Sequence, residues 1–372
     1  MLKIEIWEIL DQLEQNGFDA YAVGGCVRDS LLGINPKDWD ITTNARPEQI
    51  KYIFPNTFDT GIRFGTVCVK WNNSVVEITT FRGEKEYENH RKPMEVYFTD
   101  NLQEDLKRRD FTVNALCADK EGHIIDLFGG REDLKNGIIR AIGNPNERFF
   151  EDALRMLRAL RFACRLDFVI EPDTYHAITK NAYLLKSISA ERIRAELDEI
   201  VLFDKGIRLL SDSDLYSIIF EAQPVRFNET VYKQLPLELK YRYAYLLQSA
   251  PSGMISKLKF DRRTAAFLKN VLQYQDTPLH DALSLQRMYL KIGKDALECI
   301  VLLQQDENLL SLYRSCRFLT VGHLAINGKD ILFIAPQKRS KVLTHLVEKV
   351  FLKELDNTRP ELLRYINNLD IT

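Results

Sequence analysis

The stretch that decides the fold reads VGGCVRD at residues 23–29 and is followed by DWDI at residues 38–41. The glycine pair ends a short apolar run, and the residues after it read as the start of a helix. A glycine turn that leads into a helix exposes backbone N–H groups, which suit a triphosphate, and Arg28 can add a phosphate contact. The alternative is a tight turn without a ligand. Because paired aspartates follow within a few residues, we favour a phosphate-binding turn.

Asp38 and Asp40 flank Trp39 in a segment that we predict to be a strand. Residues i and i+2 of a strand point to the same side, so the two carboxylates would repel each other unless a divalent cation lay between them. Oxygen ligands of this kind suit Mg²⁺, and two such ions support phosphoryl transfer. Glu77, inside the apolar run VVEIT, is the best candidate for a third carboxylate. A solvent-facing strand edge would also explain it.

The rest of the chain predicts an α+β fold. Residues 1–146 mix short strands and helices, which predicts a small mixed or antiparallel sheet with helices. Residues 85–94 are charged and aperiodic, so we expect a mobile loop there. From residue 147 onward the periodicity is helical, beginning with a predicted helix over 147–164. We therefore expect three domains, a head (1–146), a helical neck (147–204) and a helical body and tail (205–372).

The predicted helix after residue 147 carries a polar stripe. Its sequence EDALRMLRALRF places Asp152, Arg155, Arg158 and Arg161 at intervals of three, which forms one slowly drifting line on a helix. Cytosine and adenine each present an amino donor beside a ring-nitrogen acceptor, whereas guanine and uracil present the reverse. A carboxylate and a guanidinium such as Asp152 and Arg155 would therefore fit C and A and reject G and U. An ordinary surface helix with an i,i+3 ion pair is the alternative.

Composition is that of an ordinary globular protein. The 372 residues are 45% hydrophobic and 28% charged, with a net charge of −2. That charge argues weakly against nucleic-acid binding, but local basic strips such as Lys107-Arg108-Arg109 remain available for phosphate contacts. The six cysteines lack zinc-ligand spacing, and no apolar run approaches the roughly 20 residues that span a bilayer. We expect a cytoplasmic protein without a membrane segment, and the sequence leaves a monomer or a homodimer open.

Six motifs in a fixed order resemble those of class II tRNA nucleotidyltransferases, the bacterial CCA-adding enzymes of the DNA polymerase β superfamily. They cover roughly residues 20–200 and read GGCVRD, DWDI, RRDFTVNAL, DLFGGREDL, EDALRMLRALRF and ISAERIRAELDEI. The resemblance implies a catalytic head, a neck that selects the nucleotide, and a body and tail that bind tRNA. It also implies addition of C, C and A to tRNA 3′ ends from CTP and ATP, without a nucleic-acid template.

The resemblance also assigns roles residue by residue. Asp38 and Asp40 would be catalytic and would hold Mg²⁺. The nucleotide would be bound by Gly25, Arg28, Arg109, Asp152, Arg155, Arg158 and Arg161.

Several rival functions stay open at this point. A poly(A) polymerase shares the head and neck motifs, and enzymes that add only CC or only A are related. The segment 84–95, with Arg91, is typical of full CCA addition. A nucleotide- or RNA-binding protein with an inactive head is disfavoured by the intact aspartate pair. A metal-dependent phosphohydrolase is disfavoured because His280-Asp281 stands alone, which favours a surface or capping role.

Three positions depart from the family pattern. Cys26 replaces a common alanine, and Arg63-Phe64 stands where a histidine often precedes G-T. The segment 335–340 lacks the glycines expected in the tail, which puts tail contacts with tRNA in doubt.

Overall fold

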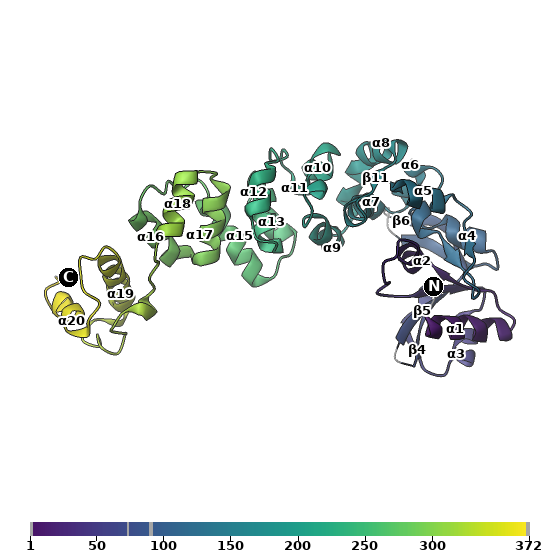
Figure 1. Ribbon diagram of the computed structural model, residues 1–372, viewed down its shortest axis with the longest axis horizontal. Coiled ribbons are helices and arrows are strands. Elements are labelled where there is room, and N and C mark those ends of the chain that lie inside the picture. Colours follow the sequence, from purple (N-terminus) through teal and green to yellow (C-terminus); the bar gives the residue numbers. More distant parts are fainter. Residues whose placement is uncertain (1–2, 73, 89–91, 370–372) are drawn as a thin grey trace. The chain divides into compact units, whose positions relative to one another are not determined.

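The computed structural model describes residues 3–72, 74–88 and 92–369. It divides into two compact units, Met1–Ala222 and Gln223–Thr372. Every described strand lies in the first unit, and the second is helical throughout its described part (Figure 1). The predicted α+β fold with a long helical continuation is confirmed. The finer division into head, neck and body at residues 146/147 and 204/205 stays a prediction.

The first unit is built on a seven-stranded sheet with the order β3-β4-β5-β2-β1-β8-β9. Its strands are β1 (Ala20–Val23), β2 (Asp40–Thr43), β3 (Thr57–Gly61), β4 (Thr66–Trp71), β5 (Ser74–Thr80), β8 (Cys117–Ala118) and β9 (Ile124–Ile125). Strands β2 and β5 run parallel, and the other neighbours run antiparallel. The parallel pairing sets Asp40 opposite Glu77. The central position of β2 in the sheet therefore fixes the backbone of Asp40.

The same part of the chain contains five helices, and those before residue 54 pack on strands of this sheet. They are α1 (Ile4–Gln15), α2 (Gly25–Leu31), α3 (Pro47–Ile53), α4 (Leu102–Lys107) and α5 (Gly130–Asn136), with 3-10 turns at Ile62–Phe64 and Thr112–Asn114. Helix α1 buries Ile6, Ile9, Leu10 and Leu13, the spacing of one helical face. A core cluster of Val23, Leu106, Ala115, Cys117 and Ile142 joins β1 and β8 to α4. This packing ties the glycine turn after β1 to the segment around Arg109.

The prediction of a mobile loop at residues 85–94 is wrong. Strands β6 (Arg82–Glu88) and β7 (Lys92–Phe98) form an antiparallel hairpin, with Arg82 opposite Phe98 and Glu88 opposite Lys92. Alternation of apolar and polar residues is weak here because a two-stranded hairpin need not bury one face in a sheet core. Arg91, on which we based a distinction between full and partial addition, lies outside the described residues.

The helix predicted over 147–164 is interrupted. Helix α6 (Pro145–Glu151) ends before Asp152, and α7 (Leu154–Arg165) begins two residues later. Asp152 has extended backbone angles, with φ −137° and ψ 103°, and its side chain accepts a hydrogen bond from the Leu154 amide at 3.1 Å. An aspartate that caps the next helix in this way competes with helix continuation. Asp152 therefore precedes the arginine stripe instead of sharing one helix with it.

The first unit ends in four further helices, which pack on α6, on α7 or on one another. They are α8 (Pro172–Asn181), α9 (Ala190–Ile200), α10 (Asp204–Asp212) and α11 (Leu215–Phe220), with a 3-10 segment at Ala182–Ser187 and the short parallel pair β10 (Ile138–Ile139) and β11 (Val169–Ile170). Helix α7 packs on α9, and β10 and β11 also contact α7. Helix α7 therefore rests both on α9 and on β10, a strand that lies before position 147.

The described part of the second unit contains nine α-helices. The helices are α12 (Glu229–Gln234), α13 (Leu239–Leu246), α14 (Met254–Lys257), α15 (Arg262–Tyr274), α16 (Ala282–Ile292), α17 (Lys294–Leu303), α18 (Glu307–Ser315), α19 (Pro336–Phe351) and α20 (Arg359–Asn367), with a 3-10 turn at Val321–His323. Asp281 caps α16 by accepting from the Ser284 amide at 2.7 Å, so the capping role expected for it is confirmed. Helix α19 begins at Pro336, within the glycine-free segment 335–340. In the described ranges, none of the helices is both long and apolar enough to cross a membrane.

Candidate functional site

A single cavity of about 610 Å³ in the first unit brings together all nine residues predicted for the site. Its lining consists of Gly24, Gly25, Arg28, Asp38, Asp40, Arg108, Arg109, Asp110, Asn114, Asp152, Arg155, Arg158, Arg161, Phe162 and Arg165. Seven of these residues are arginines and four are aspartates. Although the whole chain has a net charge of −2, arginines outnumber aspartates in the lining of this cavity, which suits a polyanionic ligand.

The glycine turn forms one wall of this cavity. Gly24 has φ 81°, a conformation that favours glycine, and a Cβ atom there would lie 3.3 Å from Nη1 of Arg109. Gly25 is the first residue of α2, and Arg28 follows one turn later. The Arg28 guanidinium is 3% exposed and donates to Asp29 and to Oδ1 of Asn114. The turn and its arginine are therefore held in place before any ligand arrives.

The predicted carboxylate pair lies on the same cavity, although not on one strand. Strand β2 begins at Asp40, and Asp38 lies in the bend before it. Burial raises the pKa of Asp40; Arg109 opposes that shift, while Glu77 and Asp38 add to it. Three carboxylates thus act on one another here, and a divalent cation would relieve their repulsion. The residues present fit a divalent metal ion, with Asp38 and Asp40 on the cavity and Glu77 exposed beside them.

Asp152 and Arg155, the pair expected to select the base, each have a different partner. Oδ2 of Asp152 lies 3.3 Å from Nη2 of Arg192 on α9. Arg155 pairs with Glu151 at 2.8 Å and also donates to the backbone carbonyls of Arg148 and Arg108. The i,i+3 ion pair that we weighed as the ordinary explanation is therefore replaced by these two separate contacts.

Sequence reasoning missed a polar network at the centre of the cavity. Asp110, 8% exposed, accepts from Arg158 at 2.7 and 2.8 Å and from Nδ2 of Asn114 at 3.0 Å. Because Asn114 also accepts from Arg28, the network connects the glycine turn to helix α7. Asp110 and Asn114 belong to RRDFTVNAL, the motif that supplied Arg109, so the signal was present in the sequence.

Sequence reasoning also missed Phe162, an aromatic residue between the arginines of α7. Its ring lies on the cavity wall, with the guanidinium carbons of Arg28, Arg158 and Arg161 at 5.1, 5.4 and 4.3 Å from its centroid. An aromatic ring at such distances attracts cations. Phe162 therefore gathers arginines from two elements around one point of the cavity.

Asp105 lies behind the cavity and is fully buried. Its carboxylate accepts from Arg108 at 2.7 Å and from Arg109 at 3.2 Å, and also from the Thr42 hydroxyl at 3.1 Å. Thr42 belongs to β2, the strand that carries Asp40. Asp105 thereby connects two cavity arginines to the strand of the predicted metal ligand.

The departure at Cys26 also has a place in the site. Cys26 is buried, and its thiol donates to the backbone carbonyl of Val23 at 3.3 Å and, more weakly, to that of Asp40 at 3.8 Å. Burial raises the pKa of this thiol, which keeps it protonated. The cysteine therefore packs between the glycine turn and β2, where a smaller alanine would leave these carbonyls without this donor.

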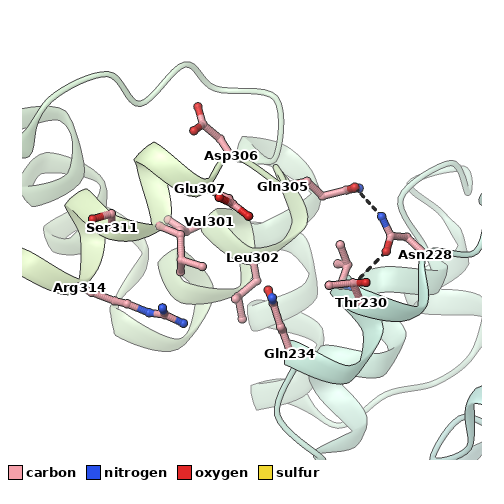
Figure 2. Close-up of a pocket in the computed structure, with 12 residues that line it drawn as sticks. Asn228, Thr230, Gln234, Val301, Leu302, Gln305, Asp306, Glu307, Ser311 and Arg314 are labelled. Atoms are coloured by element: carbon pink, nitrogen blue, oxygen red, sulfur yellow. Dashed lines mark hydrogen bonds between the residues drawn. The ribbon is translucent and has the colours of Figure 1, made fainter.

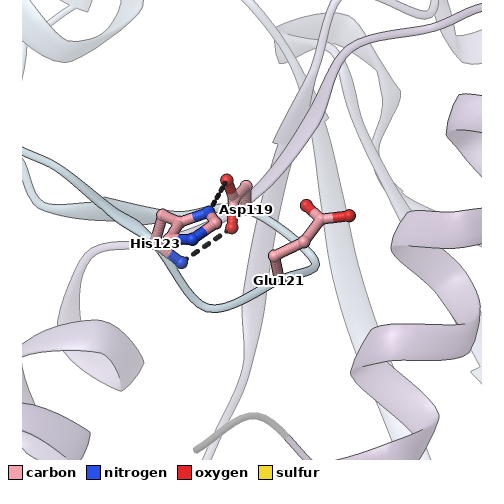
Figure 3. Close-up of side chains that lie close together, drawn as sticks. All are labelled: Asp119, Glu121 and His123. Atoms are coloured by element: carbon pink, nitrogen blue, oxygen red, sulfur yellow. Dashed lines mark hydrogen bonds and ion pairs between the residues drawn. The ribbon is translucent and has the colours of Figure 1, made fainter.

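Two other groups of polar residues lie apart from this cavity. Asp119, Glu121 and His123 gather at the turn between β8 and β9, with ligand atoms within 4.8 Å of one another (Figure 3). His123 is bonded to Asp119 through its backbone N–H at 2.7 Å and through its ring, so the turn itself accounts for most of this grouping. A cavity of about 600 Å³ in the second unit lies between α12, α17 and α18, where Asn228 donates to Gln305 (Figure 2). Neither group shares a residue with the nine-residue site.

Comparison with known protein families matches two parts of the chain, and Asp152, Arg155, Arg158 and Arg161 lie between the two matches. Residues 20–140 match the family described as "Poly A polymerase head domain". Residues 167–225 match that described as "Probable RNA and SrmB- binding site of polymerase A".

Comparison with individual proteins extends the similarity to nearly the whole chain. The CCA-adding enzyme of Limosilactobacillus reuteri (strain DSM 20016) is 35% identical over 97% of this chain and 95% of its own length. That of Ligilactobacillus salivarius is 53% identical over 56% of this chain, where the match spans about half (52%) of that relative's length. The crystal structure of the Bacillus stearothermophilus CCA-adding enzyme in complex with CTP is 33% identical, with a TM-score of 0.73 over 98% of each chain. The protein described above therefore belongs to the CCA-adding enzymes, the bacterial family of tRNA nucleotidyltransferases.

Proposed function

We propose that this chain adds C, C and A in turn to the 3′ end of tRNA, using CTP and ATP and no nucleic-acid template. The observation that carries the proposal is the shared cavity, because it combines the carboxylates, the glycine turn and the Asp152/Arg155 pair. In each addition the tRNA 3′-hydroxyl oxygen bonds to the α-phosphorus of the nucleotide, and pyrophosphate leaves. During the attack the proton of the 3′-hydroxyl passes to solvent or to a group that acts as a general base.

The basic side of the cavity would bind the triphosphate. Backbone N–H groups at Gly25 and the guanidinium of Arg28, which both line the cavity, would contact phosphate oxygens or the sugar. Arg109 lies between the glycine turn and Asp105, so it can bind the nucleotide while its own position stays fixed. Because these groups are held by buried partners, little reorganisation is needed on binding.

Asp38 and Asp40 would hold Mg²⁺, and Glu77, opposite Asp40 in the sheet, would contribute a third carboxylate. When bound, Mg²⁺ would lower the pKa of the attacking hydroxyl and neutralise charge on the triphosphate. The carboxylate of Asp40, at the start of strand β2, and that of Asp38, in the bend before it, would hold the cation at the cavity.

Base selection would follow from hydrogen-bond complementarity. A carboxylate at Asp152 accepts from the amino group of cytosine or adenine, and the Arg155 guanidinium donates to the neighbouring ring nitrogen. Guanine and uracil would instead place a carbonyl acceptor against the Asp152 carboxylate and a ring N–H donor against the Arg155 guanidinium, so neither contact would form a hydrogen bond. Leaving such groups unpaired in a site costs several kcal/mol, about 10⁴-fold in selectivity. Arg158 and Arg161 line the same part of the cavity and add positive charge.

Transfer RNA is the proposed partner of the helical residues 205–372, and the cytoplasm is the proposed location. Full-length similarity to a CCA-adding enzyme supports the first point, because the match covers both units. A poly(A) polymerase is the second candidate, since the head description that matches residues 20–140 carries that name.

Incubation with defined tRNA ends tests the proposal. We would use tRNAs that end before CCA, after C and after CC, each with one labelled nucleotide at a time. We expect CTP to be added to the first two substrates and ATP only to the third. Poly(A) tails, CTP addition without ATP addition, or ATP addition alone would each replace the proposal with the corresponding rival.

A further inference from the structure

The donor and the acceptor proposed to read the base lie only three residues apart, yet they are kept from pairing with each other. Residues at this spacing near a helix terminus are close enough to form an ion pair. If Asp152 paired with Arg155, each would satisfy the other and neither would be free to read a base. Arg155 is 8% exposed and is held by Glu151 and two backbone carbonyls. Selection therefore depends on what holds Asp152.

Asp152 is held from two sides. Its Oδ1 accepts from the Leu154 amide at 3.1 Å, and its Oδ2 accepts from Nη2 of Arg192 at 3.3 Å. Each carboxylate oxygen has two lone pairs, so one remains on each oxygen for the amino group of a base. The Leu154 contact is local and fixes only one oxygen. Arg192 comes from α9, 40 residues later, and fixes the other.

The position of Arg192 is locally unfavourable. It is the third residue of α9, after the N-cap Ser189, and a positive charge in the first turn opposes the helix dipole. Its Nη1 is buried, and the described part of the chain supplies no hydrogen-bond partner for it. Arg192 therefore has two unfavourable features, a positive charge near a helix N-terminus and a buried Nη1 donor without a partner in the described ranges. The contact between its Nη2 and Asp152 explains why an arginine lies there.

We propose that Arg192 is a specificity-determining positioning residue, which holds Asp152 away from Arg155 and aims its carboxylate at the amino group of C or A. This inference rests on the proposed function, because it concerns how the selecting pair is kept apart. Arg158, whose charge also acts on Asp152, is already bound to Asp110 and so cannot replace Arg192 in this position.

The test compares Arg192→Gln and Arg192→Lys with the wild type, with Arg194→Gln as the matched control. Arg194 lies on the same helix and pairs with Asp198, also on α9, at 3.5 Å. For each protein we would measure kcat/KM for CTP, UTP, ATP and GTP on tRNAs with the matching 3′ ends, and thermal unfolding. We expect Arg192→Gln to reduce the preference for CTP over UTP and for ATP over GTP by about tenfold or more. Arg192→Lys should stay within about threefold of the wild type, and Arg194→Gln within about twofold.

A double mutant separates positioning from a structural role. Because Arg192 acts through Asp152, adding Arg192→Gln to Asp152→Ala should change selectivity by less than about twofold, although stability can still fall. If Arg192→Gln still reduced selectivity tenfold in the Asp152→Ala protein, the inference would be overturned. It would also be overturned if the single variant Arg192→Gln kept wild-type selectivity. If the wild type itself adds neither C nor A, the proposed function fails; if the wild type is active and only these variants behave otherwise, the role of Arg192 fails alone.

Discussion

Replacement of Asp105 by asparagine should damage both the stability and the activity of the first unit. Asp105 is fully buried and accepts from Arg108, Arg109 and Thr42, so the substitution puts an amide N–H group against two guanidinium groups. Breaking a buried ion pair by removing one partner costs about 3–5 kcal/mol. The two arginine side chains are 15% and 19% exposed and can relax partly toward water, so we place the loss near the lower end, at about 3 kcal/mol.

A loss of this size is measurable in two independent ways. By calorimetry it should lower the unfolding temperature of the transition that contains the first unit by about 6–12 °C. In nucleotide addition it should reduce kcat/KM for both CTP and ATP by about 10- to 100-fold, because Arg109 lies on the cavity and acts on Asp40. Selectivity between CTP and UTP should change little, since Asp152 and Arg155 are bound elsewhere.

Asp100→Asn is the control for this experiment. Asp100 pairs with Arg46 at 3.1 Å, and its side chain is 76% exposed. Exposed pairs of this kind contribute about 0–1 kcal/mol, so the control should unfold and react almost as the wild type does. If Asp105→Asn unfolded at the wild-type temperature and kept wild-type kcat/KM, the claim that Asp105 holds the two arginines would be refuted.

Three further predictions follow from the same geometry. Asp38→Ala and Asp40→Ala should each abolish nucleotide addition while tRNA binding by filter retention stays nearly intact; wild-type incorporation by either variant would contradict the metal assignment. Asp152→Ala should relax base choice by at least about tenfold while lowering the unfolding temperature only slightly, and strict C/A selection in that variant would refute the selecting pair. Burial alone would raise the pKa values of Asp105 and Asp110, but their arginine partners outweigh it and hold both below the ordinary value near 3.8. The stability that these two carboxylates contribute is therefore present above their unfolded pKa and is lost as the pH falls through their folded pKa. The free energy of unfolding should decrease below about pH 4, and it should decrease less steeply in Asp105→Asn. The same pH dependence of the unfolding free energy in the wild type and in Asp105→Asn would count against the ion pairs.

The short motifs around the glycine turn were predictable because their chemistry is local. Gly24 must take a positive φ, and a helix must follow it, so VGGCVRD alone indicates a strand, a turn and a helix. The chemistry of short motifs also pointed to Arg28, the two aspartates of DWDI and the pair Asp152/Arg155, whereas the roles of Arg109, Arg158 and Arg161 were implied only by the family resemblance. Their convergence on one cavity depends on the order of the strands, which residue patterns do not specify.

Features that depend on distant partners were not predictable. The apolar period of EDALRMLRALRF continues through Asp152, so the pattern gives no sign that α6 ends there and α7 starts afresh. Asp105 and Asp110 look like surface charges in the sequence, yet both are buried because arginines from nearby turns and from α7 surround them. A buried carboxylate is identified by its partners, and those become visible only when the chain is folded.

The central claim is that one cavity selects C and A and transfers them in order. The most direct measurement gives the wild-type protein a tRNA that ends before CCA, together with all four nucleoside triphosphates at equal concentration and Mg²⁺. Sequencing of the 3′ ends over time should show C, then CC, then CCA, with no further growth and with G and U near background. Runs of A, products that stop at CC, or G and U at the frequency of C and A would contradict the account.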